Sequence, residues 1–211
     1  PDATRRRRRC RARGIVIVAR SPLYGTDMAF AISLKAVNDP AGPIRALWEE
    51  VSRFEIRPSM AALGYPPHLT LAAYDDIPPV QVSDALRKVF AGRSALCLTF
   101  TRLHFFENPL VLRAEPSPSA DLTCAHARVH ACIDPRLCHP HYRPGARVPH
   151  CTLGTQILAK YRGEAIAFAA RPIPAFDVVF DVADCVSFAP VVVIADQQLA
   201  RPAQSGACSR A

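Results

Sequence analysis

One five-residue pattern, Pro-His-x-Thr-Leu, occurs twice in the chain and constrains its fold more than any other feature. The first copy is Pro67–Leu71 and the second is Pro149–Leu153. A single His-x-Thr/Ser is expected by chance in a chain of this composition, but two copies with the same flanking residues are not. Because a repeated pattern indicates a repeated structural unit, we expect two related parts, each built around one copy.

Each copy lies in a short apolar run that is typical of a buried strand. Side chains alternate between the two faces of a strand. The residues that alternation places on one face of the first strand are His68, Thr70, Ala72 and Tyr74. In the second strand, His150 and Thr152 share a face in the same way. Each strand therefore presents an imidazole and a hydroxyl about 7 Å apart, close enough for both to reach one phosphate group.

The apolar periodicity predicts further elements on either side of the two copies. Strands are expected over residues 28–34, 68–74, 96–106, 110–112, 149–155, 176–180 extending towards 186, and 189–195. Helices are expected from residue 39 to the proline at 58, after the proline at 79, and over 122–133 and 156–170. Both halves of the chain thus have a similar order of strands and helices.

This order predicts an α+β fold of two lobes related by a pseudo-twofold axis. Two antiparallel sheets are expected to line a central cleft, with the helices outside. The domain is expected to span residues 28–197, with a basic extension over 1–27 and a flexible tail over 198–211. If the two motif strands meet across the axis, two imidazoles and two hydroxyls converge in the cleft.

The net charge of +8 lies mainly in the extension, where residues 1–13 contain seven arginines and one aspartate. The remaining chain is almost neutral and shows no broad basic stripe. A long RNA footprint depends on many phosphate contacts, so the body of the protein favours a short or mononucleotide substrate. With 50% hydrophobic and 21% charged residues, the composition is that of a globular protein.

The apolar runs at 15–19 and 189–195 are much shorter than the roughly 20 residues of a membrane-spanning helix. The first is also shorter than the apolar region of a secretory signal. The eight cysteines are scattered through a chain that can form an apolar core, which favours reduced thiols. We therefore expect a cytoplasmic protein without membrane contact, and a monomer.

Two histidines can divide acid and base catalysis at neutral pH, because an imidazole titrates near pH 6.5. One of His68 and His150 would act as the general base and the other as the general acid in a displacement at phosphorus. Thr70 and Thr152 would donate hydrogen bonds to the phosphoryl oxygens. This chemistry requires no metal. The alternative is that both histidines are strand-end residues whose rings bond backbone carbonyls.

On these residues the chain resembles the two-histidine (2H) phosphoesterase superfamily, in particular its 2′-5′ RNA ligase-like and cyclic phosphodiesterase branch. The resemblance covers about residues 28–197. It implies metal-independent opening of 2′,3′-cyclic phosphates on RNA ends or nucleotides, with His68 and His150 catalytic and Thr70 and Thr152 binding phosphate. It also suggests His68 as the acid and His150 as the base, although relatives that act on different bonds can reverse these roles.

Two alternatives to that function remain open. The same site could cleave or ligate 2′-5′ linkages, or the fold could bind an RNA end or nucleotide without turnover. All four motif residues are intact, which favours an enzyme over a binding module.

Aromatic and basic residues near the motifs are candidates for binding the rest of the substrate. Tyr74, Phe30 and Tyr142 could stack a base. Arg143 and Arg147, beside the second motif, could hold flanking phosphates. The alternative for each aromatic ring is a place in the core or at the rim, and for each arginine a solvated loop position.

A group of cysteines and histidines lies ahead of the second motif, and its members are Cys124, His126, His130, Cys132, Cys138, His139 and His141. His126 and His130 are one helical turn apart and share a face, which is a spacing that can bind zinc. No CxxC pair is present, however, and the spacings fit no familiar zinc module. We favour an ordinary helix followed by a His-rich loop, and expect neither a metal nor a cofactor.

Overall fold

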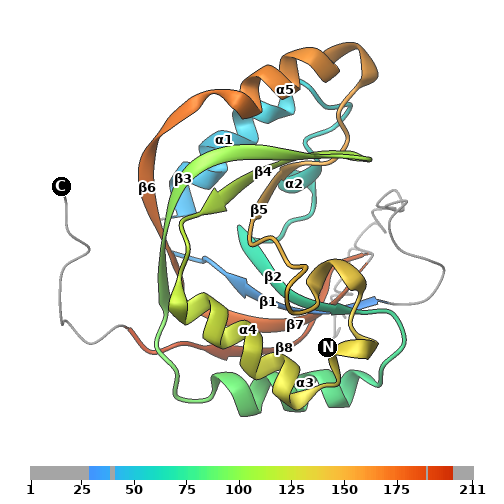
Figure 1. The fold of residues 1–211 in the computed structure, drawn as a ribbon, viewed down its shortest axis with the longest axis vertical. Coiled ribbons are helices and arrows are strands. Elements are labelled where there is room, and N and C mark those ends of the chain that lie inside the picture. Colours follow the sequence, from blue (N-terminus) through green and yellow to red (C-terminus); the bar gives the residue numbers. More distant parts are fainter. Residues whose placement is uncertain (1–28, 39–40, 189, 202–211) are drawn as a thin grey trace, which may run out of the picture.

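The fold consists of two four-stranded antiparallel sheets with helices packed on them (Figure 1). The computed structural model describes residues 29–38, 41–188 and 190–201. The first sheet has the order β2-β1-β7-β8, formed by β1 (Ala29–Lys35), β2 (His68–Tyr74), β7 (Val182–Phe188) and β8 (Val192–Gln198). The second has the order β5-β4-β3-β6, formed by β3 (Leu96–Glu107), β4 (Leu110–Pro116), β5 (Cys151–Gly154) and β6 (Pro172–Phe180). The predicted α+β class is confirmed.

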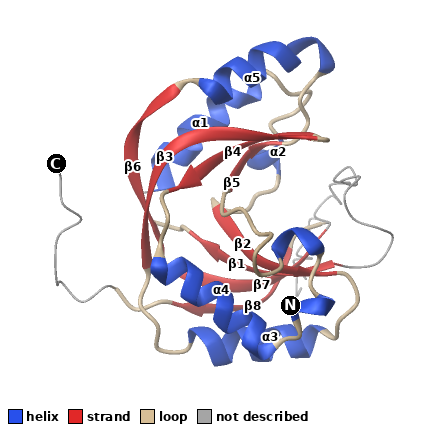
Figure 2. Cartoon of the chain, viewed as in Figure 1, coloured by secondary structure: helices blue, strands red, loops and turns tan. Residues whose placement is uncertain are grey.

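The helices divide between the two sheets (Figure 2). They are α1 (Gly42–Ser52), α2 (Ser59–Ala62), α3 (Pro79–Phe90), α4 (Ala120–Cys132) and α5 (Arg162–Ala170), with single 3-10 turns η2 (Pro135–Leu137), η3 (Pro140–Tyr142) and η4 (Ala159–Tyr161). Helices α1 and α5 pack on the second sheet, whereas α3 and α4 pack on the first. Among the described residues, no helix has the length and apolar character needed to cross a membrane.

Neither sheet is formed by one half of the sequence alone. Strands β7 and β8, from the C-terminal half, pair beside β1 and β2, and β6 pairs with β3. The chain crosses from β6 to β7 at Asp181, whose N–H donates to the carbonyl of Lys35 at 3.2 Å. The strand expected over 176–186 is therefore two strands in different sheets. Each sheet needs segments from both halves in order to form.

Local sequence explains where the helices begin. In α1, the buried residues Ile44, Leu47, Trp48 and Val51 recur at three- and four-residue spacing. Helix α4 begins after Ser119, whose hydroxyl accepts from the N–H of Leu122 at 3.2 Å.

Helix α5 begins at Arg162 rather than at the predicted residue 156. The backbone before it already pairs with the end of α1, where Ile157 bridges Glu55 and the N–H of Leu158 donates to the carbonyl of Phe54 at 2.9 Å. These extended contacts use backbone groups that a helix would need, so the helical turns start after them.

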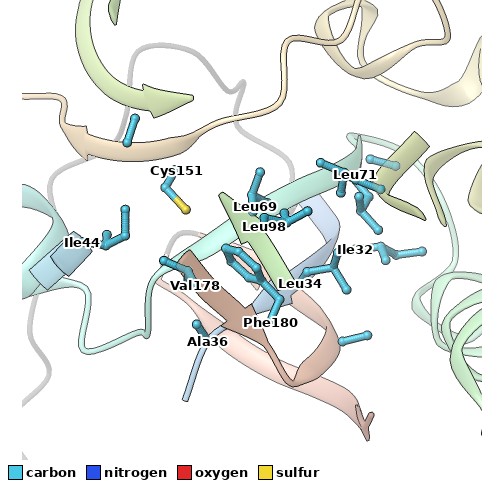
Figure 3. Packing of buried hydrophobic residues seen from close by; sticks show 14 of the residues in the cluster. Ile32, Leu34, Ala36, Ile44, Leu69, Leu71, Leu98, Cys151, Val178 and Phe180 are labelled. Carbon is cyan, nitrogen blue, oxygen red and sulfur yellow. The ribbon is translucent and has the colours of Figure 1, made fainter. Parts of the chain in front are cut away.

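One continuous apolar core joins the sheets and their helices. Figure 3 shows Leu34 and Leu69 of the first sheet within this cluster, together with Leu98 and Phe180 of the second. All four side chains are at most 2% exposed. Since the same core supports both sheets, separating them would expose apolar surface on each.

Gly154, the last residue of β5, has no room for a side chain. A Cβ atom there would lie 2.5 Å from Cγ1 of Val51 and 3.0 Å from the Oε1 of Glu55. We expect Gly154→Ala to lower the free energy of unfolding by about 1–3 kcal/mol, because α1 or β5 must shift. Urea denaturation monitored by circular dichroism measures this change.

Gly163 in α5 is the matched control, because nothing lies within 4 Å of a Cβ atom added there. Gly163→Ala is expected to be neutral or to stabilise by up to about 1 kcal/mol, as Ala is the better helix former. Equal effects of the two substitutions would contradict the close packing of α1 against Gly154.

Candidate active site

The two motif strands, β2 and β5, are edge strands of different sheets and contact each other. His68 begins β2, and His150 directly precedes β5. Within each motif the burial alternates as predicted, because His68, Thr70, His150 and Thr152 are partly exposed while the residues between them are buried. The tertiary structure thus brings both copies of the pattern to one place.

Side chains from distant segments bond the free edges of both motif strands. The Nε of Arg147 donates to the carbonyl of Thr70 at 3.0 Å. The indole Nε1 of Trp48, in α1, donates to the carbonyl of Thr152 at 2.9 Å. The loop ahead of the second motif also follows β2, since the N–H of His139 donates to the carbonyl of Ala73 at 2.8 Å. The bonds of Arg147 and His139 hold the segment ahead of β5 against β2, and the bond of Trp48 fixes β5 on α1.

The two histidines have the same hydrogen bond on the same nitrogen. Nδ1 of His68 lies 3.0 Å from the carbonyl of Pro66, and Nδ1 of His150 lies 2.7 Å from the carbonyl of Val148. A carbonyl can only accept, so Nδ1 carries the proton and Nε2 of the neutral ring is left as an acceptor. The backbone contacts of the alternative interpretation are thus present, but they use only one nitrogen of each ring.

A buried carboxylate network lies beside His68. The ring of Tyr65 is 4.7 Å from the imidazole, and its hydroxyl donates to both oxygens of Asp184, at 2.7 and 2.8 Å. Nζ of Lys35 is 3.0 Å from Asp184, which is completely buried. Burial lowers the pKa of His68, whereas the bond to Pro66 and the charge of Asp184 raise it.

Cationic side chains lie beside His150. The pKa of His150 is lowered to about 4, mainly by burial and also by the charges of Arg113, Arg147 and His68, while the bond to Val148 opposes this change. Arg113 is opposite Thr152 in the β4–β5 register, and its Nε and Nη2 lie 2.8 and 2.6 Å from Oε1 of Glu115. The two chemically identical motif histidines therefore have surroundings of different charge.

Arg147 is brought to the site and Arg143 is not. Burial lowers the pKa of Arg147 to about 10, and its Nη2 has no hydrogen-bond partner among the described residues. Arg143 instead bonds the carbonyls of Cys138 and Arg136 at 2.8 and 2.9 Å, which stabilises its own loop. Of the two arginines predicted to bind phosphate, only Arg147 lies next to a motif strand.

Phe30 and Tyr74 are in the core, 5% and 0% exposed, and neither ring can stack a base. For Tyr74 the cause is a β-bulge, since Ser33 pairs with Thr70 but the preceding Ile32 pairs with Ala72. The extra residue turns the rest of β2 over, so Ala72 and Tyr74 join the apolar face. The alternation predicted for this strand therefore fails after Thr70.

Tyr142 lies in η3, which packs beside β2. Its ring is partly buried against the core and 6.2 Å from the ring of His139. The ring is thus placed on the loop ahead of the second motif, and its role in stacking a base stays a prediction.

His126 and His130 share a face of α4, as their spacing predicts, but both are directed at one carbonyl. Their Nε2 atoms lie 2.8 and 3.1 Å from the oxygen of Tyr142 and 3.0 Å from each other. Cys132 and Cys138 are free thiols. In the part of the chain that the structure describes, no three His, Cys, Asp or Glu side chains are placed to hold a metal ion.

Five residues beside the histidines were not found by sequence reasoning, and they are Lys35, Tyr65, Phe106, Arg113 and Asp184. Phe106 is at the end of β3, and its ring is 5.2 Å from that of His150. A charged residue directly after apolar strand residues was the available signal for three of them, in the segments SLK, VLR and VAD. Nothing in the local sequence distinguishes Tyr65 or Phe106.

The fold and the paired motifs are those of a two-lobed phosphoesterase of the 2H class. A family model described as the 2′-5′ RNA ligase superfamily matches residues 40–182. The chain belongs to this superfamily. A comparison with curated protein sequences finds no match.

Several solved structures have the same fold. The Thermus thermophilus protein TT0787 is 14% identical and aligns with a TM-score of 0.55, over 82% of this chain and 99% of that chain. E. coli LigT complexed with 3′-AMP is 13% identical and aligns with a TM-score of 0.56, over 82% of this chain and 98% of that chain. At these identities the likeness concerns the fold, which extends over nearly the whole of each relative.

The buried histidine pair of α4 predicts acid lability. Burial in the folded protein lowers the pKa of His126 to about 4 and also lowers that of His130. In the unfolded chain both rings protonate near pH 6.5. The unfolded chain thus binds more protons, and stability is lost as the pH falls from 6.5 towards 4. We expect His126→Gln to reduce the slope of unfolding free energy against pH by up to about 1.4 kcal/mol per pH unit.

Urea denaturation at several pH values between 4 and 7 measures this slope. The matched control is His141→Gln, because His141 is exposed on the following loop. An unchanged slope in His126→Gln would contradict the buried neutral state of that ring.

Proposed function

We propose that this chain opens 2′,3′-cyclic phosphates on RNA ends or nucleotides by acid and base catalysis with His68 and His150. The observation that carries the proposal is the matched pair of Nδ1 bonds at two contacting strands, which leaves the Nε2 of each histidine without a hydrogen-bond partner among the described residues. Membership in a superfamily named for RNA ligation supports phosphoester chemistry. Structures of E. coli LigT with 3′-AMP and with phosphate support a nucleotide ligand.

In the proposed reaction, one histidine removes a proton from a water molecule while the oxygen of that water attacks phosphorus. The bond between phosphorus and one ribose oxygen breaks, and the second histidine donates a proton to that oxygen. Thr70 and Thr152 donate to the non-bridging oxygens, and the charge of Arg147 stabilises the phosphate. The product is a ribose phosphomonoester with a free neighbouring hydroxyl.

The charges around the histidines support His150 as the base and His68 as the acid. Arg113 and Arg147 disfavour the protonated form of His150, as a general base requires. Asp184 favours the protonated form of His68, as a general acid requires. A bound phosphate adds negative charge between the rings and favours protonation of the ring that already faces a carboxylate.

A second candidate function is cleavage or ligation of 2′-5′ linkages in the same site. The superfamily name favours it. In that reaction a ribose hydroxyl takes the place of water, and the same two histidines exchange the protons. Assays on 2′-5′ dinucleotides and on cyclic nucleotides separate the two functions.

We expect His68→Ala and His150→Ala each to lower kcat/KM on adenosine 2′,3′-cyclic phosphate by about 10²–10⁴-fold, because each removes a proton-transfer group. Activity of the unaltered protein should persist in EDTA. His141→Ala is the matched control, because it removes an exposed loop imidazole and should keep normal activity. Loss of activity in EDTA with recovery on adding zinc would contradict the metal-independent mechanism.

The pH profile of kcat/KM should form a bell on the acidic side of neutrality. Activity should rise with pH as the base, His150, loses its proton near pH 4. It should then fall as the acid, His68, loses its proton. Because burial lowers the pKa of His68, this second limb should lie below pH 6.5. Since the two rings interact, both limbs belong to the pair.

Asp184→Asn tests the assignment of the acid. Without the carboxylate, the pKa of His68 falls, so the basic limb should move to lower pH while the acidic limb stays in place. Asp196→Asn is the matched control, because Asp196 lies 4.0 Å from the same Lys35 but its side chain is 54% exposed. Movement of the acidic limb alone in Asp184→Asn would reverse the two roles.

A further inference from the structure

Phe106 lies beside His150 on the rim of the site, with its ring 5.2 Å from the imidazole. We propose that Phe106 is the platform on which the nucleobase of the substrate stacks. This inference rests on the proposed function and adds the part of the site that recognises the nucleoside.

The ring of Phe106 is partly covered and partly exposed. The guanidinium carbon of Arg113 lies 3.7 Å from the centroid of the ring, so it covers one face. Arg113 is itself only 6% exposed and is held by Glu115, which also pairs with Arg102. The side chain of Phe106 is 36% exposed, so part of the ring surface is open to solvent.

The arrangement suits a nucleobase for physical reasons. A guanidinium beneath the ring fixes its orientation through a cation–π contact, so little conformational entropy remains to be lost on stacking. Bases of every type stack on aromatic side chains. The ring centroids of Phe106 and His150 are 5.2 Å apart. Only a ribose separates the base from its cyclic phosphate, so a base stacked on Phe106 keeps the phosphate next to His150.

A second place for the base is a cavity of about 560 Å³ on the His68 side, which Trp48 and Tyr65 line together with Arg45 and Glu49. Its aromatic residues are only 7% and 8% exposed. Their polar atoms are also engaged, as the indole bonds the carbonyl of Thr152 and the phenol bonds Asp184. The cavity therefore offers little aromatic surface, which favours Phe106.

Stacking without hydrogen bonds to the base edge has a consequence for substrate choice. The site should require a base but distinguish poorly among adenine, guanine, cytosine and uracil. The substrate class is thus a nucleoside 2′,3′-cyclic phosphate of any base, with larger purines bound somewhat more tightly than pyrimidines.

Steady-state kinetics test the platform with two substrates, adenosine 2′,3′-cyclic phosphate and the 2′,3′-cyclic phosphate of methyl ribofuranoside, which has no base. We expect Phe106→Leu to raise KM for the adenosine substrate about tenfold, with kcat within about threefold. The baseless substrate should be unaffected. Phe106→Tyr should behave like the unaltered protein, and Ile56→Ala, which alters an apolar side chain that is 69% exposed, is the control.

A binding measurement independent of turnover uses Phe106→Trp. Stacking of 3′-AMP on the new indole should quench its fluorescence, beyond the change seen from Trp48 in the unaltered protein. Inorganic phosphate, which has no base, should leave the fluorescence unchanged.

Three results would decide against the platform. Equal losses of kcat on both substrates in Phe106→Leu would mean that the ring only orients His150. A raised KM in Arg45→Ala or Glu49→Ala, with none in Phe106→Leu, would place the base in the cavity. Quenching by phosphate as strong as by 3′-AMP would exclude stacking.

Failure of the unaltered protein to turn over either substrate would contradict the proposed function and not the platform. The fluorescence titration then tests whether the base stacks on residue 106.

Discussion

The carbonyls of Thr70 and Thr152 lie on the free edges of two different sheets, and each accepts one hydrogen bond from a side chain far away in the sequence. An edge strand has backbone groups without a neighbouring strand, so a second element can approach it closely. Arg147, just ahead of β5, uses the carbonyl of Thr70 to hold β2 beside β5, and Trp48 uses the carbonyl of Thr152 to fix β5 on α1. Central strands would have no free edge for such bonds. The convergence of the two motifs, and everything proposed for the site, depends on this meeting of edges.

Buried charges make the duplicated motifs chemically different. On the His68 side the ion pair of Lys35 and Asp184 directs a carboxylate towards the imidazole, whereas on the His150 side Arg113 and Arg147 present guanidinium groups. Burying ionised groups costs free energy, and pairing offsets part of that cost. Their placement next to the histidines gives the two rings different affinities for a proton. A pseudo-symmetric fold can thereby support an asymmetric reaction.

The interleaving of the chain connects the fold to the site. Asp184 and His68 are more than one hundred residues apart in the sequence, and the pairing of β7 with β1 places them near each other. Arg113 reaches Thr152 in the same way, through the pairing of β4 with β5. The common core under both sheets fixes these positions. Relatives at 14% identity keep the fold over 99% of their length, so the architecture needs few specific residues.

The sequence by itself was sufficient for the strand positions of the motifs, the periodicity of α1, the α+β class and the shared face of the histidine and threonine in each motif, because each follows from patterns among neighbouring residues. It could not predict the bulge that moves Tyr74 into the core, since strand register depends on the partner strand. It could not find Asp184, Tyr65 or Phe106 either. These residues reach the histidines through strand pairing and packing between segments far apart in the sequence. A local sequence pattern cannot predict such contacts. The tertiary structure alone decided which side chains surround each imidazole.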